Sequence, residues 1–265
     1  MIEEYTDTII LLICGFGSGI FVSLSSGTAV AIVIPCLTIL IGYSIYVAIG
    51  TSLIIDCVIG AVAGIIFLRS GNVDLRSGFL LAITGIIGAL IGSRFTGETS
   101  GSGLGAFIGI FLIITGVNFI VKGIQKNIDF IEEKISLKFF KEHKIPFLII
   151  FGLIIGLISG FSGMGGSRMV ALVLIFILGY KIHTAIGTSL IMMVFIAGSG
   201  AIGHAINGEV ALDAALLIAP AAGLGALTGS LIANRINEDL LGRIVGIIIL
   251  ALGVLIMYNT FFNGV

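Results

Sequence analysis

Two breaks rich in glycine and serine interrupt the otherwise apolar sequence. The first is Ser23-Leu-Ser-Ser-Gly27 and the second is Gly160-Phe-Ser-Gly-Met-Gly-Gly166. A helix that begins at such a break exposes backbone N–H groups whose partial positive charge favours anions. Glycine lets the backbone approach a ligand closely, and serine or threonine adds hydroxyl donors. The breaks therefore predict an anion-binding site that is formed by Ser25, Ser26, Gly27, Thr28, Gly163, Gly165, Gly166 and Ser167.

A Gly-Thr-Ser triplet occurs twice in the chain and supplies further hydroxyl groups. Thr51 and Ser52 belong to the first copy, and Thr188 and Ser189 belong to the second. We expect the two triplets to approach one another near mid-depth in the membrane, beside the two breaks, and to extend the anion site. The alternative interpretation is that the glycines are packing contacts and that the triplets are helix N-caps.

Two charged residues fall within apolar stretches, where a charge is costly and marks a functional candidate. Asp56 follows the first triplet by about one helical turn and could bind a coupling proton or cation. Arg168 follows the second break and could hold an anionic substrate. The alternatives are that the two side chains pair with each other, or that Arg168 extends to the membrane interface.

Ser162 and His204 suggest a competing chemistry. Gly160-Phe-Ser-Gly163 is a G-x-S-G motif, and His204 could act as its general base, as in a rhomboid-like intramembrane serine protease. The motif consists of four common residues inside a glycine-rich break, and an internal duplication has no use in that mechanism. We therefore expect no enzyme activity. His204 is interpreted as an interfacial residue, with a proton relay as the alternative, and Glu209 as a solvated loop residue.

The composition requires a membrane protein. Of the 265 residues, 58% are hydrophobic and 10% are charged, whereas a soluble domain carries about 25% charged residues. Charge-free runs such as residues 8–55 and 99–121 provide the roughly 20 apolar residues that a membrane-spanning helix needs. They lack the alternation of outer-membrane β-strands. The predicted fold class is all-α, a polytopic helical membrane protein.

An internal repeat organises the chain. Ala48-Ile-Gly-Thr-Ser-Leu53 recurs as Ala185-Ile-Gly-Thr-Ser-Leu190, an offset of 137 residues (185 − 48), and many glycines keep this offset without a gap. The predicted halves are 1–122 and 146–265, and a basic linker at 123–145 joins them. Each half divides into five apolar segments, at 8–23, 28–42, 45–68, 75–94 and 103–122, and again at 146–161, 165–180, 182–205, 212–233 and 240–260.

The first two segments of each half are short. About 15 to 16 residues reach about 24 Å at 1.5 Å per residue, which is less than a bilayer core of about 30 Å. Short, glycine-interrupted helices in matching places of two halves are typical of a transporter binding site. Each half crosses an odd number of times, whether these segments span the membrane or re-enter. The two halves are therefore predicted to be inverted repeats.

The distribution of lysine and arginine predicts the orientation, because these residues favour the cytoplasmic side. Lys122 and the linker together hold six of the thirteen, and the loops that fall on the same side hold Arg69, Arg76, Lys181, Arg235 and Arg243, so that eleven lie on one side. We expect this side to be cytoplasmic and both termini to be extracytoplasmic. The linker itself is interpreted as an amphipathic helix on anionic lipid.

The repeated A-x-G-T-S-L motif, which follows a Gly-Tyr pair, and the G-x-x-S-G-F-S-G-M-G-G motif at 156–166 resemble the sulfite exporter TauE/SafE family of membrane permeases. The resemblance covers nearly the whole chain. It implies a secondary transporter in the cytoplasmic membrane that moves sulfite, an organosulfonate or a related sulfur-containing or carboxylate anion by alternating access. An anion channel that uses the same helix ends is the alternative.

The expected partners are the small anion and the lipid bilayer. The net charge of −1 gives no reason to expect nucleic acid. A homo-oligomer is compatible with the sequence. The three cysteines lack C-x-x-C spacing, and we expect neither a metal site nor a cofactor.

Overall fold

A computed structural model of the chain describes residues 2–25, 27–122, 144–232 and 238–262. All regular elements in these ranges are helices, which confirms the all-α class, and seven of them are long and apolar enough to cross a membrane. The helices are α1 Ile2–Ser25, α2 Val30–Pro35, the π-helix η1 Cys36–Ile41, α3 Ile45–Arg69, α4 Leu75–Glu98, α5 Gly101–Lys122, α8 Lys144–Ser162, α9 Ser167–Leu178, α10 Ile182–Ile206, α11 Leu212–Ile232 and α12 Glu238–Phe262. Residue 26 and the linker at 123–143 lie outside the described residues.

The first segment of each half is longer than predicted. Helix α1 has 24 residues and α8 has 19, and both contain a stretch long enough to span a bilayer. The prediction was wrong because helices continue through the polar residues that flank an apolar run. Only the second segments are short: α9 has 12 residues, and α2 and η1 have 6 each.

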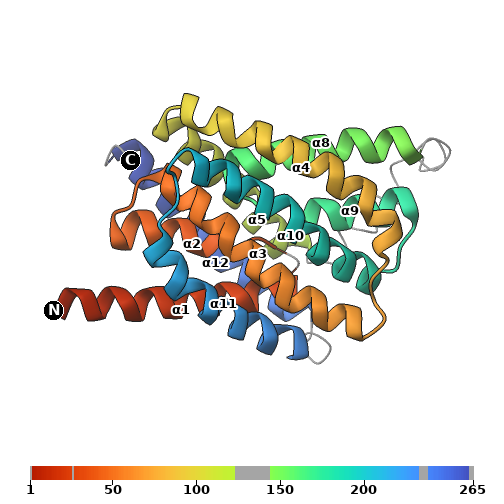
Figure 1. The fold of residues 1–265 in the computed structure, drawn as a ribbon. Coiled ribbons are helices and arrows are strands. Elements are labelled where there is room, and N and C mark those ends of the chain that lie inside the picture. The colour runs from red at the N-terminus through yellow and green to blue at the C-terminus, as the bar shows by residue number, and fades with distance from the viewer. Residues whose placement is uncertain (1, 26, 123–143, 233–237, 263–265) are drawn as a thin grey trace.

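Contacts between helices pair elements from opposite halves. Helix α1 packs on α11, α8 on α4, α3 on α10, and α5 on α12. Figure 1 shows α3 and α10 in the middle of the bundle, with α1 and α11 on one side and α4 and α8 on the other. Under the offset of 137 the α1–α11 pair becomes the α8–α4 pair, and the α3–α10 and α5–α12 pairs each map onto themselves. The contacts therefore obey a two-fold relation between the halves.

Two contacts join residues that are equivalent under the offset. The Cys57 Sγ lies 3.5 Å from the Val194 carbonyl oxygen, and the Gly165 N–H donates to the Thr28 hydroxyl at 3.3 Å. Equivalent residues can touch only at the axis that relates them. The two-fold relation therefore has its axis at the crossing of α3 and α10 and between the two breaks. The inversion of the halves relative to a bilayer stays a prediction.

Glycine brings the paired helices into backbone contact. A Cβ placed on Gly19 of α1 would lie 2.0 Å from the Ala222 carbonyl oxygen, and one on Gly156 of α8 would lie 2.0 Å from the Gly85 carbonyl oxygen. These two contacts are equivalent under the offset of 137. Membrane helices associate through such close packing of small residues, because no hydrophobic force joins them in lipid.

This packing gives a testable prediction for stability. We expect Gly19→Ala to lower the free energy of unfolding by about 1–3 kcal/mol, because the added methyl group forces two backbones apart. Gly17→Ala on the same helix is the matched control, since a Cβ at Gly17 would have no atom within 4 Å. Thermal unfolding in detergent measures both. Equal melting temperatures for the two variants would contradict the role of Gly19.

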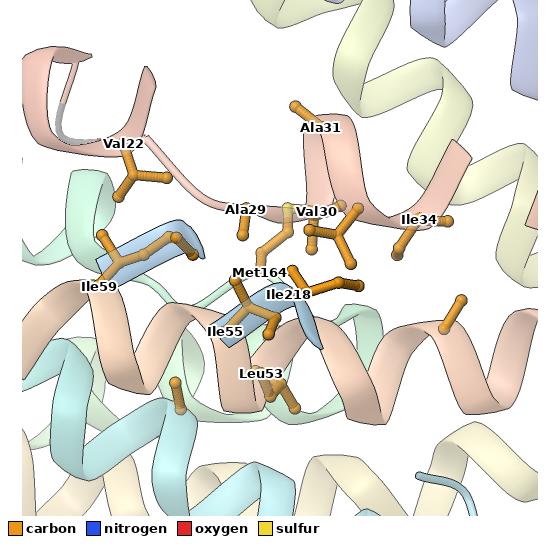
Figure 2. Packing of buried hydrophobic residues seen from close by; sticks show 14 of the residues in the cluster. Val22, Ala29, Val30, Ala31, Ile34, Leu53, Ile55, Ile59, Met164 and Ile218 are labelled. Carbon is orange, nitrogen blue, oxygen red and sulfur yellow. The ribbon is translucent and has the colours of Figure 1, made fainter. Parts of the chain in front are cut away.

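Apolar side chains from several elements surround the first break. Figure 2 shows Ala29 and Val30 of this region close to Ile55 of α3 and to Met164 of the second break, in a cluster that also contains Ile34. All of these side chains are buried. The core therefore holds the two breaks close together at the centre of the bundle.

Candidate functional site

The two breaks are narrower than the sequence motifs suggested. Helix α1 includes Ser23, whose hydroxyl donates to the Ala226 carbonyl at 3.2 Å, so the first break contains residues 27–29 among those described. The second break contains residues 163–166. Gly163 and Gly166 both have a φ of +78°, a conformation that glycine adopts without steric cost. These two glycines let α8 end and α9 begin within four residues.

Asp56 joins the two breaks. Its Oδ1 accepts from the Ala29 N–H at 2.7 Å, and its Oδ2 accepts from the Thr28 hydroxyl at 2.6 Å and the Gly165 N–H at 3.0 Å. The side chain is fully buried. A Cβ at Gly165 would lie 2.6 Å from Oδ2, so glycine is needed there. Among the described residues these are the partners of the carboxylate, and the predicted alternative of a pair with Arg168 is not formed.

A cavity of about 40 Å³ lies beside the two breaks. Since a volume of about 10–15 Å³ admits one water molecule, the cavity has room for a few water molecules or a small anion. Arg168 is the one charged side chain among the described residues that line it. The described lining residues are Phe21, Gly27, Thr28, Ala31, Phe111, Leu112, Thr115, Met164, Gly166, Ser167, Arg168, Met169 and Ile249.

The first turn of α9 faces this cavity. Ser167, Arg168 and Met169 all line it, and they are the first three residues of the helix. Their backbone N–H groups lie at the positive end of α9, where no preceding helical turn supplies an acceptor. Arg168 and the positive end of α9, which favours anions, therefore border the same cavity.

The serines of the two triplets contact the breaks outside the cavity. The Ser52 hydroxyl lies 3.4 Å from the Gly163 carbonyl oxygen, and the Ser189 hydroxyl lies 3.1 Å from that of Ser167. Both serines are fully buried. They position the breaks, and they do not line the cavity.

The threonines of the two triplets have a different role from the predicted one. The Thr51 hydroxyl accepts from the Ala211 N–H at 3.0 Å, and that of Thr188 accepts from the Asp74 N–H at 2.9 Å. Each threonine thus caps the start of a long helix of the opposite half, α11 for Thr51 and α4 for Thr188. The triplets lie at opposite ends of the α3–α10 pair, so the expectation that they meet was wrong. The antiparallel crossing near Cys57 separates them.

One polar atom beside the second break has no partner. The Ser159 hydroxyl is fully buried and makes no hydrogen bond with the described residues. Its Cβ lies 3.9 Å from the position that a Cβ would take at Gly166. Because a buried hydroxyl without a partner is costly, this atom is a candidate contact for a water molecule or ligand at the break.

The serine protease dyad that was considered as an alternative is not assembled. The Ser162 hydroxyl donates to the Ile158 carbonyl of its own helix at 2.6 Å. His204 Nε2 lies 2.8 Å from the Gly160 carbonyl oxygen, and Nδ1 lies 2.7 Å from Glu209 Oε2. His204 is fully buried and Glu209 is its partner. The interpretations of an interfacial histidine and a solvated glutamate were therefore wrong.

Sequence reasoning missed several residues of the cavity. Thr115 and Phe111 of α5 and Met164 of the second break line it. Met164 belongs to the glycine-rich motif at 160–166, so its place in the sequence indicated that it lies at the site. Helix α5 is separated from the breaks by two long helices, and no feature of the sequence indicated that it returns to them.

Comparisons with known proteins agree with this architecture. The model of the sulfite exporter TauE/SafE family matches residues 11–256. The chain is 24% identical over 227 residues to the probable membrane transporter protein YunE of Bacillus subtilis, which covers 82% of each chain. It is 32% identical over 114 residues to the probable membrane transporter protein YdhB of the same organism, which covers 43% of this chain and 46% of that one. No solved structure matches.

The family model spans all but the ends of the chain and includes both breaks, both triplets and the cavity between them. From its sequence and its fold, the chain is a membrane transporter of the sulfite exporter TauE/SafE family.

Proposed function

We propose that the chain is a secondary transporter for a small anion, which it binds in the cavity between the two breaks. The observation that carries the proposal is that Arg168 and the first turn of α9 border one cavity whose other described lining residues are neutral. An anion that leaves water must find fixed donors, and the first turn of α9 supplies backbone N–H groups beside Arg168.

Asp56 supports this proposal as an internal anion. Its carboxylate is bound by two backbone N–H groups and one hydroxyl of the breaks. Backbone N–H and hydroxyl groups of the breaks are also the donors that the sequence predicted for a substrate anion. The breaks are thus able to bind a carboxylate away from water, and a carboxylate or sulfur oxyanion in the cavity would use the same chemistry.

Asp56 is also our candidate for the coupling site. While it is ionised, it accepts hydrogen bonds from both breaks at once. A proton on Oδ2 would make this oxygen a donor to Thr28, and the Gly165 N–H would lose its carboxylate partner. Binding of a proton would therefore loosen the second break from the first. A cation would act in the same direction by competing for the carboxylate.

The two-fold relation of the contacts supports alternating access. The breaks meet at the axis, so exchanging the conformations of the two halves would open the cavity to one side and then to the other. The family and the two relatives support a transporter of this general kind. The proposed substrates are sulfite, an organosulfonate or a related small sulfur-containing or carboxylate anion.

Flux through the purified protein in liposomes tests the proposal. We expect uptake of radiolabelled sulfite or an organosulfonate to saturate, and an unlabelled internal pool to accelerate uptake by counterflow. A channel with the same site would give uptake without counterflow. In detergent, a bound anion should raise the melting temperature, because a ligand of the native state stabilises by RT ln(1 + [L]/Kd). No stabilisation by any of these anions would contradict the proposal.

Orientation gives a second prediction, which concerns topology. We propose that the linker is cytoplasmic and that both termini are extracytoplasmic, because eleven of thirteen basic residues fall on one side. In a variant without Cys14, Cys36 and Cys57, single cysteines at positions 4 and 263 should react with an impermeant maleimide outside intact cells. A cysteine at position 133 should react only after the cells are opened. Labelling of position 133 from outside would overturn the orientation.

A further inference from the structure

The two contacts of the His204 ring need one more proton than a neutral imidazole and an ionised carboxylate carry together. A carbonyl oxygen only accepts, so the contact of 2.8 Å with Gly160 places a hydrogen on Nε2. Nδ1 lies 2.7 Å from Glu209 Oε2. Without another proton, this contact would set the lone pair of a neutral ring against a carboxylate. We infer that His204 and Glu209 together form a proton-binding site, which holds one proton between the ring and the carboxyl group.

The end of α8 favours the form in which the proton is on His204. Gly160 lies in the last turn of α8, and its carbonyl has no partner within the helix. Unpaired carbonyls give a helix C-terminus a partial negative charge, which a cation stabilises. The Thr96 hydroxyl of α4 contacts the same helix end, at 3.0 Å from the Phe161 carbonyl oxygen and 3.4 Å from that of Gly160. The proton site therefore holds the end of α8 beside the second break.

Several elements pack against this pair, and few of their groups are charged. Helix α4 contributes Gly97, where a Cβ would lie 3.4 Å from Glu209 Oε1. Arg94 and Glu98 of α4 are charged, and they line a neighbouring hollow together with Gly203 and Asn207. Helix α3 contributes Gly50, which contacts the Cβ of His204. The described residue of α8 that meets the imidazole is Gly160, which has no side chain to titrate.

The equivalent place in the first half has the same packing without the proton chemistry. Under the offset of 137, His204 corresponds to Phe67 and Glu209 to Asn72. Gly187 packs on Phe67 and on the carbonyl of Asn72, just as Gly50 packs on His204 and on the carbonyl of Glu209. The scaffold thus forms without a titratable pair. The proton site is an addition to one end of the molecule, and it would exist whichever anion the cavity binds.

Spectroscopy of the full-length protein tests the inference. The chain has three histidines, so ¹⁵N-histidine NMR is sparse, and His204→Gln assigns the resonances. We expect either both ring nitrogens of His204 to be protonated, or an infrared carboxylic acid band that disappears in Glu209→Gln. Either signal would show the shared proton directly. Neutral imidazole with an ionised Glu209 would overturn the proton site.

A second measurement uses the first half as a template. The double variant His204→Phe, Glu209→Asn gives the second half the residues of the first, and we expect it to fold. A proton bound only by the folded state stabilises it at low pH and is lost as pH rises. The melting temperature of the wild type should therefore fall with rising pH more steeply than that of the double variant. The same pH dependence in both proteins would overturn the inference.

Discussion

Arg168→Ala is expected to abolish anion transport while leaving the protein folded. Arg168 is the one charged side chain among the described residues of the cavity. A hydrogen bond to a charged group contributes about 1.5–3 kcal/mol, and about 1.4 kcal/mol is a tenfold change in affinity. We therefore expect anion binding to weaken about 10- to 100-fold. The shift of the melting temperature with added sulfite measures binding, and liposome uptake measures transport.

Two control variants sharpen this prediction. Arg168→Lys keeps the positive charge but loses the planar donors of the guanidinium, so it should retain weakened binding. Arg69→Ala removes an exposed arginine from the end of α3 and should leave both measurements unchanged. If Arg168→Ala bound the anion and transported it as the wild type does, the cavity would not be the substrate site.

Asp56→Asn is expected to uncouple transport from its driving gradient. The amide resembles a protonated carboxyl group, since one of its two polar atoms donates and the other accepts. It can still accept from the Ala29 N–H and can donate to the Thr28 hydroxyl, which also lies 3.3 Å from the Gly165 nitrogen. We therefore expect the variant to fold and to bind the anion. Its uptake should no longer respond to an imposed pH or cation gradient.

Asp56→Ala is the comparison that separates coupling from structure. It leaves the Ala29 N–H without its carboxylate partner and the Gly165 N–H with only the longer contact to Thr28, and a buried unpaired group costs about 1–3 kcal/mol. This variant should melt well below Asp56→Asn. Wild-type transport by the double variant Arg168→Ala, Asp56→Asn would contradict the roles of both residues.

The sequence predicted the bounds of the helices better than it predicted the contacts between them. The long helices α3 and α10 begin and end within a few residues of the expected segments, because apolar runs bounded by polar turns define them. Ser23 shows the limit of this reasoning. A serine that bonds a carbonyl of another helix is indistinguishable in sequence from one at a break, so the first break was placed too early.

The site was predictable where chemistry is local and unpredictable where it depends on packing. Gly27, Thr28, Gly166, Ser167 and Arg168 line one cavity, as their clustering along the chain suggested. The pairing of His204 with Glu209 was missed because burial of a helix end depends on the elements around it. The caps made by the triplet threonines were missed for the same reason, since each donor comes from the opposite half.

The packing of helices of one half on helices of the other has a consequence for the synthesis and insertion of the protein. Gly19 of α1 meets Ala222 of α11, about 200 residues later in synthesis. At about 5–20 residues per second, α11 follows α1 from the ribosome by about 10–40 seconds. During that interval the glycine face of α1 has no permanent neighbour in the lipid. The chain therefore cannot complete its first half before it has nearly finished its second, and truncated products should remain unassembled and open to proteolysis.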